Sequence, residues 1–233
     1  MWFMDPLYII IIGPALLLAL WAQAKVKFAF SRYSRVANLA GITGAQAARW
    51  ILDGNGLQDV PVEAYSGWLT DHYDPRRRVL RLSPQVFSQP SVAAVGIAAH
   101  EAGHALQHST GYFPLRFRNA IVPTAQIGSW LAFPMILIGM LLALKTLALA
   151  GFILFLGIVL FQVVTLPVEL NASSRAKKVL AEMRIVQSPD EARAVNSVLS
   201  AAAMTYVAAT ITALAQLVYF AFRIGLIGGR RRN

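Results

Sequence analysis

Four long apolar runs limit what this chain of 233 residues can fold into. The first, residues 7–24, reads LYIIIIGPALLLALWAQA and contains no charged side chain. Three more lie at 121–144, 147–168 and 204–227, and Lys145 separates the second from the third. A helix of about 20 apolar residues crosses the ~30 Å hydrocarbon core of a bilayer. The sequence therefore predicts a mainly α-helical, integral membrane bundle of about four transmembrane helices, the middle two forming a hairpin.

Two of these runs allow a second interpretation. Run 7–24 could be a cleaved signal peptide, but Asp5 precedes it where a basic segment would stand, and Lys25 follows it in place of a small-residue cleavage site. We therefore expect a retained span. Run 204–227 carries polar residues such as Thr210. It is either a transmembrane helix packed against other helices or a buried core helix.

The composition limits the chemistry and the partners. Hydrophobic residues make up 57% of the chain and charged residues 14%, against about 25% charged in a typical soluble domain. The absence of cysteine excludes disulfides and thiolate ligands, so His, Asp or Glu must bind any metal. The net charge of +10 favours contact with anionic lipid, because no basic patch interleaved with aromatic residues indicates nucleic acid. We expect the lipid bilayer as a partner, and no nucleic acid.

The polar segments 25–118 and 169–203 carry the signals of a small α+β region. Thr43 and Gln46 form a capping box, which predicts a helix that ends near Gly54. Residues 69–82 alternate around an Asp-Pro turn and predict a short strand pair.

The stretch AAHEAGHALQH, residues 98–108, contains three of the four histidines within an apolar run. Burying such groups without partners costs about 1–3 kcal/mol each. Residues i and i+4 of a helix lie on one face, so His100 and His104 can bind one Zn²⁺. Glu101 lies about 100° around the helix, where the general base of a zinc peptidase stands. We predict a metal site rather than a set of partnered core residues.

A catalytic zinc site needs a third protein ligand, and Glu169 is the favoured candidate. It follows the span 147–168 directly, so the hairpin returns it to the side of the membrane that holds His100. Its charge could instead interact with the N-terminus of a helix that it opens, or pair with Arg175.

Two histidines are weaker candidates for the third ligand. His108 is in line with the first two on one straight helix, so the three nitrogens could not form three corners of a tetrahedron unless the helix breaks near residue 107. We expect a supporting or structural role for His108. His72 could approach from the strand pair.

The motifs HEAGHALQH, VELNASSRA and LTDHYDPRRRVLRLSP resemble those of the YugP-like bacterial family of neutral zinc metallopeptidases, over essentially the whole chain. The layout is also similar to that of the membrane proteases HtpX and CAAX prenyl protease, in which a hairpin separates the H-E-x-x-H helix from a glutamate ligand. This resemblance implies a Zn²⁺ cofactor, His100, His104 and Glu169 as ligands, Glu101 as general base, and a single membrane-embedded metallopeptidase domain over 1–233.

The chain departs from these relatives at one position. They carry an acidic residue four positions after the glutamate ligand, where this chain has Ser173. We therefore expect support for the histidines to come from elsewhere, with Asn171 as the candidate.

The sequence thus predicts a membrane-bound zinc metalloendopeptidase that acts on peptides or membrane proteins. The alternative is an inactive zinc-binding scaffold or adaptor in the membrane. Such sites usually contain a further donor to the oxyanion, for which the candidates are His72, Tyr73, Tyr112 and Arg175. The strand pair could bind an extended substrate by edge pairing, or have a structural role only.

The distribution of basic residues predicts the orientation of a multi-pass protein in the cell membrane. Segment 25–118 holds eleven Lys and Arg and segment 169–203 holds five, whereas Lys145 stands alone in the hairpin turn. The positive-inside rule places both polar segments, and hence the active site, in the cytoplasm. The basic tail GGRRRN opposes this assignment.

Overall fold

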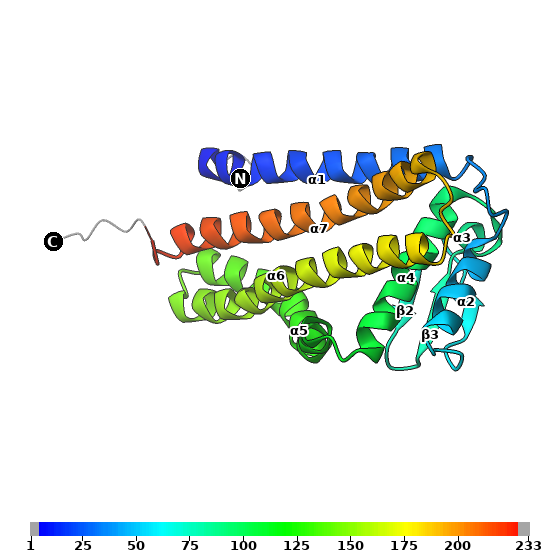
Figure 1. Ribbon diagram of the computed structural model, residues 1–233. Coiled ribbons are helices and arrows are strands. Elements are labelled where there is room, and N and C mark those ends of the chain that lie inside the picture. The colour runs from blue at the N-terminus through cyan, green and yellow to red at the C-terminus, as the bar shows by residue number, and fades with distance from the viewer. Residues whose placement is uncertain (1–4, 228–233) are drawn as a thin grey trace. The chain divides into compact units, whose positions relative to one another are not determined.

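The computed structural model describes residues 5–227, so the basic tail lies outside the described residues. The described chain is mostly helical, as predicted (Figure 1). Four of its helices are long and apolar enough to cross a membrane: α1 (Pro6–Tyr33), α5 (Phe113–Leu141), α6 (Lys145–Glu182) and α7 (Pro189–Arg223). The prediction of four membrane-spanning helices is confirmed as far as helix length and composition are concerned. Most of run 204–227 belongs to one of them, α7.

All four of these helices extend well beyond the predicted spans at one end. Helix α1 continues nine residues past the end of run 7–24, and α6 continues from the third run to Glu182. The polar continuations are rich in Ala, Lys, Arg and Glu, which favour helix and do not break it. Glu169 therefore lies inside α6 and opens no helix of its own. The alternative that this carboxylate interacts with a helix N-terminus is wrong.

The chain divides into two compact units, which are described separately. Within the described residues, the first comprises 5–22, 116–167 and 205–227, which hold the apolar parts of the four long helices. Its core is formed by residues from all four helices, among them Ile12, Ile136, Phe155 and Tyr219. Large apolar side chains also point outward, Trp130 being 81% exposed, as expected of a surface that faces lipid. The prediction of a single functional domain over 1–233 stays a prediction.

The second unit comprises residues 23–115 and 168–204 and contains all the predicted site residues. Helix α2 (Gly44–Gly54) begins with the predicted capping box of Thr43 and Gln46. Strands β2 (His72–Asp74) and β3 (Val79–Leu82) form the predicted antiparallel pair, with Tyr73 opposite Leu80. A third strand, β1 (Val62–Ala64), pairs parallel with β3 and gives the order β1-β3-β2. Helix α3 (Pro84–Ser88) connects the sheet to α4 (Val92–Ser109).

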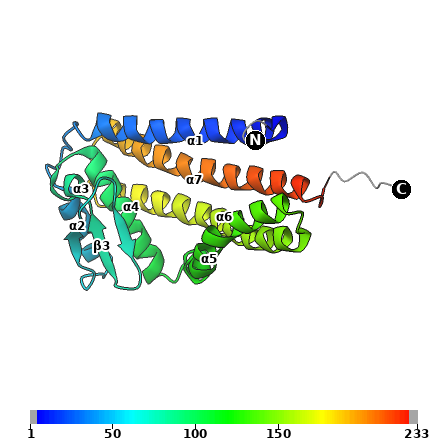
Figure 2. The ribbon, with the colours of Figure 1, turned by 180° about the vertical axis from the view of Figure 1, so that it is seen from behind.

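Helix α4 is almost entirely buried in the second unit, and Figure 2 shows it beside the strands of the sheet. The Ser91 hydroxyl accepts a hydrogen bond from Ala94 N at 3.2 Å and caps its first turn. Almost every residue from Val92 to Gln107 is buried, many of them alanine or glycine. Small side chains on a buried helix let neighbouring backbones come close, so α4 can lie against the sheet, α2 and the end of α6.

Candidate metal centre

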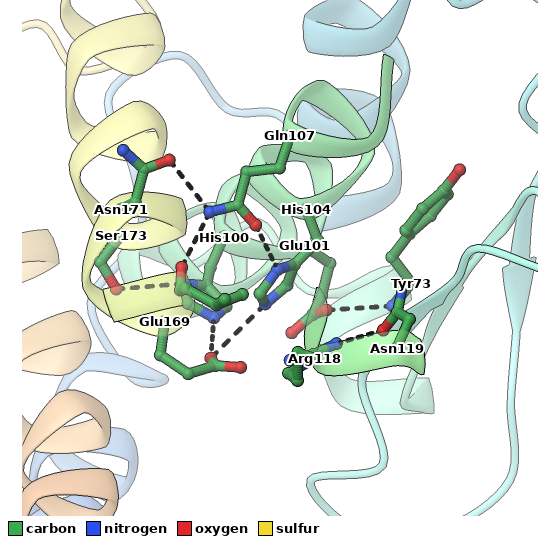
Figure 3. A network of polar contacts seen from close by, with 11 residues as sticks. Tyr73, His100, Glu101, His104, Gln107, Arg118, Asn119, Glu169, Asn171 and Ser173 are labelled. Carbon is green, nitrogen blue, oxygen red and sulfur yellow. Dashed lines mark hydrogen bonds and ion pairs between the residues drawn. The ribbon is translucent and has the colours of Figure 1, made fainter. Parts of the chain in front are cut away.

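The histidines of the H-E-x-x-H motif lie on α4 and face Glu169 on α6 (Figure 3). His100 Nε2 is 3.2 Å from Glu169 Oε2, and His104 Nε2 is 3.5 Å from the same oxygen. The two imidazole rings stand edge to face with centroids 4.8 Å apart. All three side chains are largely buried. The structure therefore brings together the three predicted ligands, although His100 and Glu169 are 69 residues apart in the sequence.

A glycine in the motif permits this close approach of α4 and α6. A Cβ atom built on Gly103 would lie 2.7 Å from the carbonyl oxygen of Ala172. Only a residue without a side chain fits there, because real Cβ contacts of this kind are not shorter than 3.0 Å. Gly103 thus sets the separation of the two helices that carry the three ligand atoms.

Glu101 lies on α4 beside the histidines, and strand β2 holds it. Tyr73 N donates a hydrogen bond to Glu101 Oε2 at 3.1 Å. Figure 3 shows the second carboxylate oxygen on the side facing the imidazoles. The pKa of Glu101 is raised to about 7, chiefly by burial and in part by the nearby charge of Glu169, against the lowering effect of His100. Such a carboxyl group can both take up and release a proton near neutral pH.

The outer nitrogens of both imidazoles also have partners. Ser173 Oγ lies 3.1 Å from His100 Nδ1, and Gln107 Oε1 lies 3.0 Å from His104 Nδ1. The expectation that Ser173 would not support the histidines is therefore wrong, because a hydroxyl on the facing turn of α6 reaches the ring. Asn171 contacts neither imidazole in the hydrogen bonds found and instead accepts one from Gln107 Nε2 at 3.0 Å.

Sequence reasoning missed Gln107, although a signal was present. It is three residues after His104, so it lies on nearly the same face of the helix. It is also an amide in an apolar run, and it is fully buried. A buried amide needs partners for its oxygen and its nitrogen, so a role beside the histidines could have been inferred.

The other candidate residues have partners away from the ligand atoms. His108 is not brought to the metal group, since α4 does not break at Gln107 and His108 Nδ1 lies 2.9 Å from the Tyr73 hydroxyl. His72 Nδ1 lies 2.7 Å from Thr70 O. The Arg175 guanidinium lies over the ring of Tyr112 at 5.8 Å. A role for one of these groups at the oxyanion stays a prediction.

The geometry of the three ligand atoms fits a divalent metal ion. One nitrogen of each imidazole and one carboxylate oxygen lie within 4.8 Å of one another. Two donors bound to a tetrahedral zinc at about 2.0–2.1 Å are about 3.3–3.4 Å apart. The distances from the two imidazole nitrogens to Glu169 Oε2, 3.2 Å and 3.5 Å, lie on either side of this value. Two imidazoles and a carboxylate are also a ligand set that zinc accepts, with room for a fourth ligand.

The fold and this group define a class of protein, one with four helices long and apolar enough to cross a membrane and a His-His-Glu group of the kind that binds zinc in peptidases. Comparison with known proteins agrees with this class. Residues 8–225 match the model of the family described as "Putative neutral zinc metallopeptidase", and the chain belongs to this family.

A curated relative covers almost the same length. The chain is 48% identical to the "Putative membrane protease YugP" of Bacillus subtilis (strain 168) over 97% of this chain and the whole of that protein. No solved structure was found to match the chain.

Proposed function

We propose that this protein is a membrane-bound zinc metalloendopeptidase. One observation carries the proposal, namely that His100, His104 and Glu169 turn three ligand atoms toward one point while Glu101 lies beside them. A zinc ion bound there would polarise the scissile carbonyl and lower the pKa of the attacking water. A metal that only stabilised the fold would not require a carboxylate in the position of Glu101, which disfavours the role of an inactive scaffold.

In the proposed reaction, Glu101 accepts a proton from the water molecule that attacks the peptide carbonyl. It then delivers this proton to the leaving nitrogen as the carbon–nitrogen bond breaks, so protons and charges balance. The Tyr73 N–H keeps one carboxylate oxygen in place, which leaves the other oxygen for the proton transfer. Proton transfer by a positioned side chain contributes typically 10²–10⁴-fold to the rate.

Glu101→Gln tests this mechanism. The variant keeps the volume and one hydrogen-bond acceptor of the side chain but cannot act as a base. We expect zinc content equal to that of wild type, with hydrolysis of a casein or membrane-protein substrate reduced by about 10²–10⁴-fold. Glu182→Gln is the matched control, because this side chain is 61% exposed at the end of α6. A Glu101→Gln protein as active as the control would exclude Glu101 as the base.

The substrate would be a peptide segment in extended form. Strand β2 is an edge strand of the sheet, and its residue Tyr73 bonds directly to Glu101. A strand added at such an edge binds through main-chain hydrogen bonds and tolerates many side chains. The edge position of β2 supports edge pairing through its main-chain groups other than the Tyr73 N–H, which already donates to Glu101. Such binding favours an endopeptidase over an enzyme that needs a chain terminus.

We also propose that the site faces the cytoplasm, on the basis of the basic residues in the two polar segments. Since the chain has no cysteine, single cysteines report their side of the membrane directly. Lys178→Cys on the site side should react with an impermeant maleimide only after the cells are permeabilised. Lys145→Cys in the hairpin turn should react in intact cells. The reverse labelling pattern would reverse the orientation.

A further inference from the structure

Gln107 is an amide with no exposed surface, and its three hydrogen bonds fix the direction of its side chain. Its Nε2 donates to the carbonyl oxygen of Val168 at 2.8 Å and to Asn171 Oδ1 at 3.0 Å. A backbone carbonyl can only accept a hydrogen bond. The nitrogen of the amide must therefore face α6, and its oxygen must face His104 (Figure 3).

The direction of the amide determines which nitrogen of His104 carries the hydrogen. Gln107 Oε1 lies 3.0 Å from His104 Nδ1 and can only accept. The neutral imidazole must then carry its hydrogen on Nδ1 and its lone pair on Nε2, the atom that faces Glu169. A lone pair and a carboxylate oxygen 3.5 Å apart have no hydrogen between them, so this arrangement suits a cation.

A further donor extends this chain of hydrogen bonds along α6. Arg175 Nε donates to Asn171 Oδ1 at 2.8 Å. Since a guanidinium has no acceptor, it fixes the Asn171 oxygen toward Gln107. Hydrogen bonds in such a series polarise one another. Each hydrogen bond from Arg175 to His104 can therefore have only one donor and one acceptor, whereas the Ser173 hydroxyl beside His100 can donate or accept.

We infer that Gln107 is a positioning residue for the metal, and that Asn171 and Arg175 act on the metal through it. The inference rests on the proposed zinc site and goes beyond it, because it predicts how residues that do not touch the metal determine its affinity. Loss of such outer partners of metal ligands typically weakens metal binding by about 10–100-fold.

The first test is zinc affinity of the full-length protein in detergent, measured by competition with a chromophoric chelator. Gln107→Met should weaken zinc binding by about 10–100-fold, while Gln89→Met, at an exposed amide, should not change it. An affinity within about two-fold of wild type for Gln107→Met would overturn the inference.

The hydrogen-bonded series from Arg175 through Asn171 and Gln107 to His104 is called the relay below. The direction in which zinc affinity changes on substitution of Arg175 separates the relay from simple charge effects. Arg175→Met removes a positive charge near a cation site, so Coulomb's law alone predicts tighter zinc binding. The relay predicts weaker binding, and no further weakening when Arg175→Met is added to Gln107→Met. Lys178→Met, at a lysine 73% exposed on the same helix, is the charge control. Tighter binding by Arg175→Met, or additive losses, would contradict the relay.

The second test needs neither metal nor activity. In metal-free protein labelled with ¹⁵N-histidine, the His104 imidazole should be protonated at Nδ1 in wild type and should shift toward protonation at Nε2 in Gln107→Met. A merely structural role of Gln107 would lower stability and leave this equilibrium unchanged. If both tests succeed and wild type shows no hydrolysis, the proposed peptidase function fails and the positioning role stands. If wild type binds no zinc, both fail.

Discussion

The contact between Gly103 and Ala172 gives a sharp test of how the two ligand-bearing helices are held together. In Gly103→Ala, the new Cβ atom would lie 2.7 Å from the Ala172 carbonyl oxygen and 3.3 Å from its carbon. Both are backbone atoms in the middle of α6, so no side chain can rotate away. The helices must separate to relieve the contact.

The cost can be estimated from this geometry. Moving the Cβ–oxygen contact from 2.7 Å to an ordinary 3.4 Å opens the helix pair by about 0.7 Å. Overpacking of this kind costs about 1–3 kcal/mol, and the better helix propensity of alanine offsets about 1 kcal/mol. We expect the unfolding free energy of the metal-free protein to fall by only about 0–2 kcal/mol. Zinc affinity should fall more, by roughly 10–100-fold, because Glu169 moves away from both imidazoles.

The matched control is the same substitution two turns earlier in the same helix. A Cβ atom on Gly96 would meet Val195 Cγ1 at 3.5 Å, which is an ordinary contact. Gly96→Ala should therefore leave zinc affinity unchanged and stabilise the protein by up to about 1 kcal/mol. Thermal unfolding with and without chelator, together with chelator competition, measures both effects. Equal zinc affinity in the two variants would refute the claim that Gly103 sets the metal geometry.

Three further predictions follow from the second unit. Glu169→Gln should abolish the zinc-dependent rise in melting temperature, a stabilisation of about 2.7 kcal/mol when free zinc is 100 times the wild-type dissociation constant; an undiminished rise would exclude this ligand. Tyr73→Phe removes the hydroxyl that lies 2.9 Å from His108 Nδ1, and should lower stability by about 0.5–1.5 kcal/mol in urea unfolding without loss of zinc. Burial raises the pKa of Asp71 above its ordinary 3.8, against the lowering effect of hydrogen bonds from Ser83. The folded state therefore holds this proton more tightly, and stability is lost as pH rises from 3.8 through the folded-state pKa. Melting curves of Asp71→Asn should lack this loss, so its melting temperature relative to wild type should increase over that range; a constant difference would contradict the assignment.

The membrane helices were predictable from the sequence, but their ends were not. Runs of about 20 uncharged apolar residues have few alternative structures, so the four spans could be placed. Where each helix ends depends on the residues that follow. At 169–182 these residues form helix as well as the span before them, and only tertiary packing decides that α6 continues.

The three candidate ligands could be named from the sequence for a different reason. His100 and His104 follow from helical spacing alone, and Glu169 followed from the hairpin that returns the chain to the same side. Gln107 carried a signal in its helical spacing from His104 that was not used, whereas Ser173 was missed because its role depends on the distance between α4 and α6. That distance is set by a glycine whose importance becomes visible only when its neighbour across the helix pair is known. Strand β1 was missed because it is three residues long and pairs with a strand that follows much later.

The polar residues of α4 and α6 explain why a metal, rather than packing alone, should hold these two helices together. Gln107, Asn171 and Ser173 are buried or partly buried and each has a hydrogen-bond partner. Among the described residues, the buried side-chain atom found without a partner is Arg49 Nε, outside the site. The pair His104 Nε2 and Glu169 Oε2 differs from all these contacts, since the direction of Gln107 leaves an acceptor on each side. Two facing acceptors attract only through a cation that both can bind, either a proton that makes the imidazole a donor to Glu169 or a divalent metal. Helix packing therefore brings together three groups that need a shared cation, and a bound divalent metal would supply it.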